Sequence, residues 1–106
     1  MVITTTESLP GRRITVVKGV AVGSTVRTKN IGKDIGAGFK SLVGGELKSY
    51  SAMLVEARSE ALSRMEAQAT ELGADAVVNL RFMTSAVASG ASEILAYATA
   101  VTTEPV

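Results

Sequence analysis

The 106-residue sequence contains no cysteine and no histidine, and these two absences exclude most familiar site chemistries. Without cysteine the chain has no disulfides, no thiolate metal ligands and no cysteine nucleophile. Histidine is the commonest metal ligand and the commonest general base near neutral pH. Catalytic triads and histidine-based zinc sites are therefore excluded, and we expect no enzyme, no catalytic residue, no metal ligand and no cofactor.

Large side chains are also scarce. Aromatic residues make up 4% of the chain and tryptophan is absent, while much of the 46% hydrophobic fraction is alanine and valine. Small side chains bury little apolar area, which contributes about 25 cal/mol per Å². A chain of this length buries only about 65% of its unfolded surface when it folds alone. We expect one domain, residues 1–106, with a thin core that favours association of several copies.

Targeting signals and a strong charge excess are missing as well. The N-terminus lacks the basic and apolar regions of a signal peptide, and no stretch approaches the ~20 apolar residues of a membrane span. We therefore expect a cytoplasmic protein without a membrane partner. The net charge is +1, with basic residues concentrated in the first half and acidic residues in the second. Nucleic-acid-binding domains usually show a strong basic excess, so we expect no nucleic-acid partner; an anion-binding face stays open.

The apolar pattern predicts four strands. A short strand at residues 2–5 precedes a long one at 14–26, whose Gly19 and Gly23 predict a bulge or a close backbone approach. Residues 76–85 alternate, which predicts Val78, Leu80 and Phe82 on one face. Residues 94–103 form the last strand, with alanines opposite larger side chains, and a loop of small residues at 87–92 makes these two strands a hairpin.

Helical periodicity lies between the second and third strands. Residues 50–72 follow a 3.6-residue apolar period, and Gly73 provides the left-handed C-cap. A weaker helical segment covers residues 31–43 and ends at Gly44 and Gly45. The element order predicts a two-layer α+β domain in which one helical layer covers one face of the sheet. The two long strands carry apolar residues on both faces, so we expect the uncovered face to contact another subunit.

Carboxylates offer the remaining metal chemistry. Glu56, Glu60, Glu71 and Asp75 could supply oxygen ligands to a hard divalent cation. The alternative is a solvated helix face held by ion pairs, because Glu60 and Arg64 form an i,i+4 pair. The glycines of residues 36–41 begin like a dinucleotide-binding fingerprint, but the third glycine is replaced by serine and the segment lies in a helical pattern. Nucleotide binding is therefore not expected.

Tyr50 and Arg58 are the best candidates for a polar pocket. Tyr50 lies between the Gly44-Gly45 pair and the long helix, and Arg58 follows two turns later. The alternative is that the Tyr50 ring packs locally while Arg58 pairs with an acidic side chain. An enzyme of unfamiliar type using Tyr50, Arg58 or a lysine would require a titratable group with a strongly shifted pKa.

Several segments in this order resemble the YbjQ-like family of small bacterial proteins, described as "putative heavy-metal-binding". The resemblance covers essentially the whole chain and is carried by residues 3–6, 9–11, 20–23, 44–45, 50, 56–58, 61 and 72–78. It implies a β-α-β-β subunit of the dodecin-like type with an extra short N-terminal strand, an antiparallel sheet packed on a long helix, and assembly into a homopentamer.

Together these observations predict an uncharacterised, non-enzymatic pentamer whose partner is itself. We expect a small ligand or partner to bind at subunit junctions, with Gly44, Gly45, Tyr50 and Arg58 as the ligand-binding residues. The alternative function is divalent metal binding through carboxylate ligands, as the family description suggests.

Overall fold

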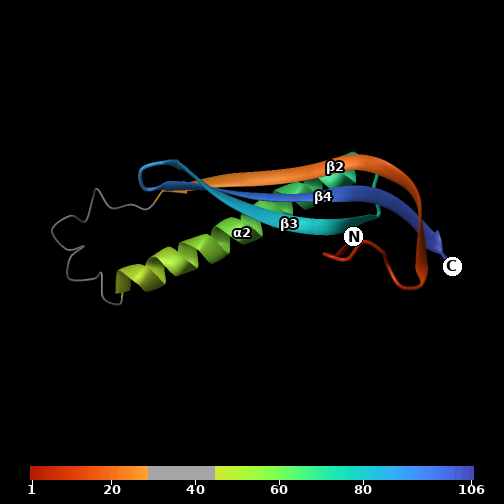
Figure 1. Cartoon of the computed structure of the whole chain (residues 1–106), viewed down its shortest axis with the longest axis horizontal. Helices are drawn as coiled ribbons and strands as arrows, with labels where there is room; N and C mark the ends of the chain where they lie inside the picture. The colour runs from red at the N-terminus through yellow and green to blue at the C-terminus, as the bar shows by residue number, and fades with distance from the viewer. Residues whose placement is uncertain (29–44) are drawn as a thin grey trace.

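The computed structural model describes residues 1–28 and 45–106, with side-chain surroundings described from residue 50 in the second range. Four strands and one helix occur in the order β1 (Val2–Ile3), β2 (Arg12–Thr28), α2 (Gly45–Glu71), β3 (Ala76–Ala88) and β4 (Ala91–Pro105). The strands form one sheet in the order β1-β3-β4-β2, and α2 lies along one face of it (Figure 1). The α+β prediction is confirmed, while the helical segment predicted at residues 31–43 lies outside the described residues.

The sheet is long and narrow because β2 and β4 pair along almost their whole length. They are antiparallel from Arg12, opposite Pro105, to Thr28, opposite Ala91. A 17-residue strand rising about 3.3 Å per residue spans roughly 55 Å. β3 pairs antiparallel with β4, whereas β1 runs parallel to β3, so the sheet is antiparallel apart from this short edge strand.

Helix α2 starts five residues before the predicted Tyr50, at Gly45, and ends at Glu71, one residue earlier than predicted. The apolar periodicity used for the prediction begins at Tyr50, so it misses a polar first turn. The C-terminus is a Schellman motif, in which Gly73 N donates to Thr70 O and Ala74 N donates to Ala69 O, at 3.0 and 3.1 Å. Gly73 has φ +83°, which confirms the predicted left-handed C-cap.

The helix lies unusually close to the sheet because both contacting surfaces are made of small side chains. A β-carbon added to Gly23 would lie 2.2 Å from Met65 N and 2.3 Å from Ala61 O, which confirms the predicted close approach. Gly19, with φ +132°, follows a register shift and confirms the predicted bulge. The central contact residues are Ala57, Ala61, Met65 and Ala69 of α2 with Ala21, Ala96, Ala98 and Ala100 of the sheet.

The predicted alternation of β3 is wrong at one point. Asn79 adopts φ 56°, and the pairing with β4 shifts register between Val78 and Arg81. This bulge places Leu80 in the core beneath α2, while Val78 packs in a second small core on the opposite face. Its cause is the N-terminal segment, since Asn79 N donates to Thr6 O at 2.9 Å and Leu80 N donates to Thr4 O at 3.0 Å.

The β3–β4 hairpin is confirmed but is tighter than the predicted loop at residues 87–92. The strands continue to Ala88 and from Ala91, and Gly90 takes φ 75° in the turn. The predicted faces of β4 are also confirmed. Its alanines at 96, 98 and 100 are buried under α2, whereas Leu95, Tyr97 and Thr99 point to the other face and are half-buried.

Candidate functional site

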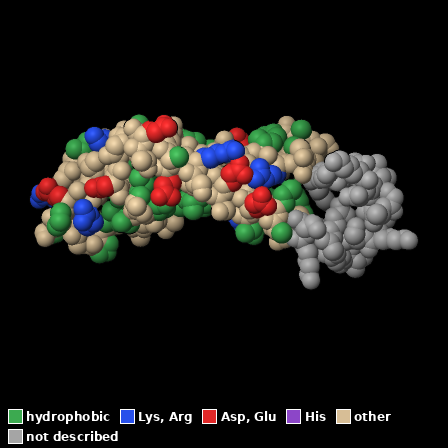
Figure 2. Space-filling view, turned by 180° about the vertical axis from the view of Figure 1, so that it is seen from behind, with side chains coloured by type: hydrophobic (Ala, Val, Ile, Leu, Met, Phe, Trp, Pro, Cys, Tyr) green, Lys and Arg blue, Asp and Glu red, His purple; other side chains and the backbone are tan. Residues whose placement is uncertain are grey.

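Charged side chains of both signs are intermingled on the face of the molecule drawn in Figure 2. The view from behind shows basic and acidic groups side by side and no broad area of one sign (Figure 2). Within the described residues, no helix is both long enough and apolar enough to cross a membrane. A basic side chain from the first half of the chain meets acidic side chains from the second half where β2 packs against α2.

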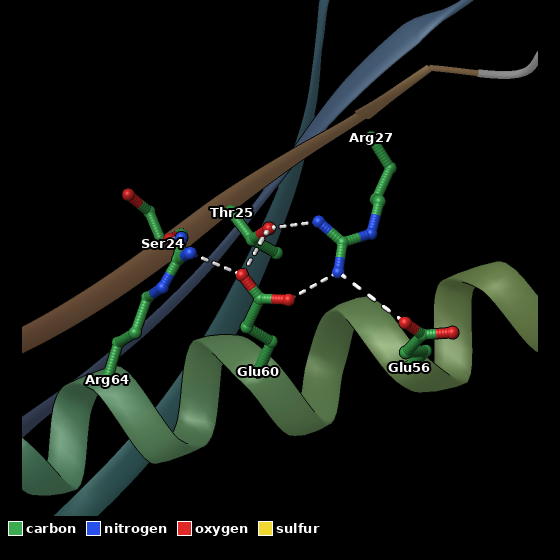
Figure 3. A network of polar contacts seen from close by, with 6 residues as sticks. All are labelled: Ser24, Thr25, Arg27, Glu56, Glu60 and Arg64. Atoms are coloured by element: carbon green, nitrogen blue, oxygen red, sulfur yellow. Dashed lines mark hydrogen bonds and ion pairs between the residues drawn. The ribbon is translucent and has the colours of Figure 1, made fainter.

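A polar network joins the last residues of β2 to the middle of α2 (Figure 3). Arg27 of β2 donates to Thr25 Oγ1 at 2.8 Å and to one carboxylate oxygen of Glu60, while Glu56 Oε1 lies 3.9 Å from Arg27 Nη2. Arg64 pairs with the other Glu60 oxygen and donates to the Ser24 carbonyl at 2.6 Å. Glu60 therefore lies between two guanidinium groups that come from different elements.

The electrostatics of this network keep Glu60 ionised. The hydrogen bond from Arg27 lowers the pKa of Glu60 below its ordinary value, and the charges of Arg27 and Arg64 and the Thr25 hydroxyl act in the same direction. Partial burial opposes them, because a charged carboxylate loses hydration there. The bonds of this network hold α2 against β2. The charges of its two arginines and two glutamates cancel, so the network has no net charge to attract an ion.

The ion pair between Glu60 and Arg64 confirms the i,i+4 pair that the sequence predicted on this face of the helix. Arg27 was missed by the sequence analysis. It lies 33 residues before Glu60, in a strand whose relation to the helix is set only by packing, so no local pattern identified it.

The four carboxylates considered as metal ligands do not come together. Glu56 and Glu60 face Arg27. Glu71 lies at the other end of α2, about 16 Å along the helix axis from Glu60. The Asp75 carboxylate accepts from Thr103 N at 3.1 and 3.2 Å and from Thr103 Oγ1 at 3.2 Å. Among the side chains that the structure describes, no three acidic ones are grouped closely enough to hold a metal ion.

The predicted ligand-binding residues lie at the start of α2. Gly44 lies outside the described residues, and Gly45 begins the helix. Tyr50 is half-buried, and Arg58 is exposed two turns later, about 12 Å along the helix axis. Ligand binding by these residues stays a prediction.

The sheet face opposite α2 carries several exposed apolar side chains. The register places Val22 beside Tyr97 and places Leu95 beside Met83, so these side chains are neighbours across three strands. We call this surface the outer sheet face; its exposed apolar residues include Val20 (63%), Val22 (39%), Val26 (53%) and Met83 (51%).

Known proteins similar to this chain share its whole length. A UPF0145 protein from Methanoculleus marisnigri is 58% identical over 105 residues, which cover 99% of this chain and 98% of that protein. Another from Thermotoga petrophila is 54% identical over all 106 residues, with complete coverage of both proteins.

A solved structure has the same fold. It is a protein of unknown function from Pediococcus pentosaceus, assigned to the DUF74 family, with a TM-score of 0.69 and 18% sequence identity over 98% of each chain. The family described as "Putative heavy-metal-binding" matches residues 1–104. The fold, the near-complete coverage and this match agree with the resemblance, and the chain belongs to the YbjQ family.

Proposed function

We propose that the protein is a non-enzymatic cytoplasmic module built from several copies of this chain, which binds a small ligand or partner where its subunits meet. The outer sheet face carries this proposal. The family resemblance implies five subunits, and the Gly44 to Arg58 region is the proposed ligand-contacting part.

The outer sheet face has the properties of a subunit contact. Single exposed apolar side chains are ordinary on protein surfaces, but contiguous ones mark sites of association. Val22 lies beside Tyr97 of β4, and Leu95 of β4 lies beside Met83 of β3, so apolar residues of three strands share this face with the polar residues Thr99 and Arg81. Since α2 packs against the other face, no described element of the chain itself covers this one, which favours a second molecule or a partner.

The polar network supports a structural rather than a catalytic role for the charged residues of α2. An acid–base catalyst needs a group whose pKa is tuned towards the working pH. Glu60 has its pKa moved in the opposite direction, away from neutrality, by two arginines that hold it in place.

A heavy-metal role does not fit the residues present. Soft metals prefer thiolate, thioether and imidazole ligands, but the whole sequence lacks cysteine and histidine, and its four methionines are dispersed along the chain. Glu56 and Glu60 pair with arginines, Asp75 accepts from Thr103, and the described acidic side chains form no cluster of three that could hold a metal ion. We therefore assign no step or site to a heavy metal.

The subunit contact is tested by native mass spectrometry and sedimentation of the wild type and of Val20→Lys. We expect a multi-subunit wild type, and a smaller species for Val20→Lys because a lysine ammonium in an apolar contact loses its hydration. Val55→Lys is the matched control, since Val55 is 54% exposed on α2. Circular dichroism verifies that both variants fold. A monomeric wild type would contradict the proposal.

Ligand binding is tested by a thermal-shift screen of small molecules, repeated with Tyr50→Phe and Arg58→Ala. A ligand that raises the Tm of the wild type should lose most of this effect in at least one variant. Equal shifts in all three proteins would place the ligand elsewhere.

A further inference from the structure

The two flanks of helix α2 have different surroundings. One flank is formed by the residues that directly precede the buried positions 57, 61, 65 and 69. All of them bond or pair with β2, and three are drawn in Figure 3; they are Glu56, Glu60, Arg64 and Gln68. The polar groups of this flank are therefore occupied by the protein's own strand.

The opposite flank of α2 is formed by the residues that directly follow the buried positions. Consecutive helix residues are about 100° apart, so the residues before and after a buried one lie on opposite sides of it. Because the first flank points to the β2 edge, the second is turned towards β4 and β3. Its members are Arg58, Leu62, Glu66 and Thr70, of which Leu62 packs partly on the core and Arg58 is exposed.

Strand β3 has an incompletely covered aromatic side chain on the helix side of the sheet. Helix α2 packs mainly on β2 and β4, and β3 is the next strand beyond them. Phe82 pairs with Ala96, and Thr84 pairs with Ile94. Cross-strand partners share a face, and both partners are buried under α2. Phe82 itself is 42% exposed, so it lies beside the helix without being covered by it.

The strand register places Phe82 level with Leu62. Gly23 lies against the α2 backbone between residues 61 and 65. The same row of the sheet leads from Gly23 to Ala96 and then to Phe82. Since Leu62 is on the flank turned towards β3, the two apolar side chains border the same strip of surface.

The next row places Thr84 level with Arg58. Thr25 lies against Glu60, to which its hydroxyl donates at 3.5 Å. That row continues through Ile94 to Thr84. Arg58 belongs to the same turn of α2 as Glu60 and points to the β3 side. The strip therefore has an apolar part, Phe82 and Leu62, followed by a polar part with a guanidinium and a hydroxyl.

The charge of Arg58 is not compensated. Every other described arginine pairs with a glutamate or donates to an oxygen of the chain. Arg58 has no such partner among the described residues. The acidic residue on its own flank, Glu66, follows two turns later at about 12 Å along the axis, which is more than a Debye length at physiological salt. An anion at Arg58 would therefore meet a free guanidinium.

We propose that Arg58 and Phe82 bind a small amphipathic anion, such as an aromatic or long-chain carboxylate. The anionic group pairs with the Arg58 guanidinium, whose planar donors match a carboxylate. The apolar part lies on Phe82 and Leu62, where it removes exposed apolar surface from water. The inference rests on the proposed function, because it names the ligand class for Arg58 and adds Phe82 of β3 to the contacting residues.

Fluorescence titration with two related probes tests this site. Anilinonaphthalene sulfonate carries aromatic rings and an anionic group, and phenylnaphthylamine carries the same rings without the charge. We expect saturable binding of the sulfonate, weakened about tenfold in Arg58→Gln, since a hydrogen bond to a charged group contributes at least this much. Binding of the uncharged amine should be unchanged in Arg58→Gln, whereas Phe82→Ala should weaken binding of both probes.

Arg13→Gln is the matched control, because Arg13 is exposed at the other end of β2 and pairs with Glu104. It should bind both probes like the wild type, and circular dichroism verifies that each variant folds. Absence of saturable sulfonate binding would overturn the inference. The same follows if Arg58→Gln binds the sulfonate like the wild type, or loses both probes equally.

Two outcomes separate this inference from the proposed function. A ligand from the thermal-shift screen that needs Arg58, combined with sulfonate binding that does not, would overturn the amphipathic anion and keep the proposed function. A monomeric wild type that binds the sulfonate through Arg58 would overturn the proposed assembly and keep this site.

Discussion

Replacing Gly23 by alanine should destabilise the protein more than any other single methyl addition at a described glycine. The new β-carbon would lie 2.2 Å from Met65 N, 2.3 Å from Ala61 O and 2.8 Å from a backbone carbon of Arg64. Ordinary contact begins at 3.4 Å, so the nearest separation must grow by more than 1 Å. All three neighbours belong to the helix backbone, and no side-chain rotation can relieve the clash.

The cost follows from what the helix loses when it moves away. Ala57, Ala61, Met65 and Ala69, on the side of the helix that faces the sheet, are completely buried, and a radial gap of 0.5–1 Å already forfeits a quarter to a half of each van der Waals contact. Overpacking costs typically 1–3 kcal/mol where side chains can adjust. Here the backbone must move, so we expect a loss of about 3 kcal/mol or more in the free energy of unfolding.

Urea denaturation followed by circular dichroism at fixed subunit concentration measures this loss. Gly11→Ala is the matched control, because a β-carbon there meets nothing within 4 Å. Its φ of +79° gives a conformational cost of roughly 1–2 kcal/mol and no clash. A Gly23→Ala protein within about 1 kcal/mol of the wild type, or a control equally unstable, would refute the close contact between helix and strand.

Three further predictions concern the core, the polar network and metals. Met65→Ala should cost about 3 kcal/mol of unfolding free energy by urea denaturation, because it leaves a cavity in a fully buried site; a cost below 1 kcal/mol would mean that the helix collapses to fill it. Because the folded pKa of Glu60 is lowered, its stabilisation is complete above the unfolded pKa of about 4.3 and is lost as the pH falls through the folded pKa. Glu60→Gln should therefore reduce the fall of the urea midpoint below about pH 4, and an unaltered pH profile would contradict the assignment. Equilibrium dialysis with Zn²⁺, Ni²⁺ and Cu²⁺ should show no stoichiometric binding, and one bound ion per subunit would show that the argument from ligand chemistry is wrong.

Local sequence patterns predicted most of the secondary structure. The periodicity of α2, the Gly73 cap and the alternation of β4 depend on neighbours within one or two turns, or on the same strand. The same kind of reasoning predicted a bulge or a close backbone approach at Gly19 and Gly23, and the structure has the bulge at Gly19 and the close approach at Gly23. It missed the bulge at Asn79, because that bulge is stabilised by residues 4–6, about 75 positions earlier in the chain.

The sequence by itself determined which chemistry is excluded and which elements form, because residue types and short-range spacing are sufficient for both. Only the tertiary structure decided how they meet. It brought Arg27 against Glu60, turned Gln68 and Arg64 onto the backbone edge of β2, and left the corresponding edge of β3 without a partner among the described residues. These contacts join segments far apart in the chain, and their geometry is fixed by how closely alanine and glycine surfaces let the helix approach the sheet.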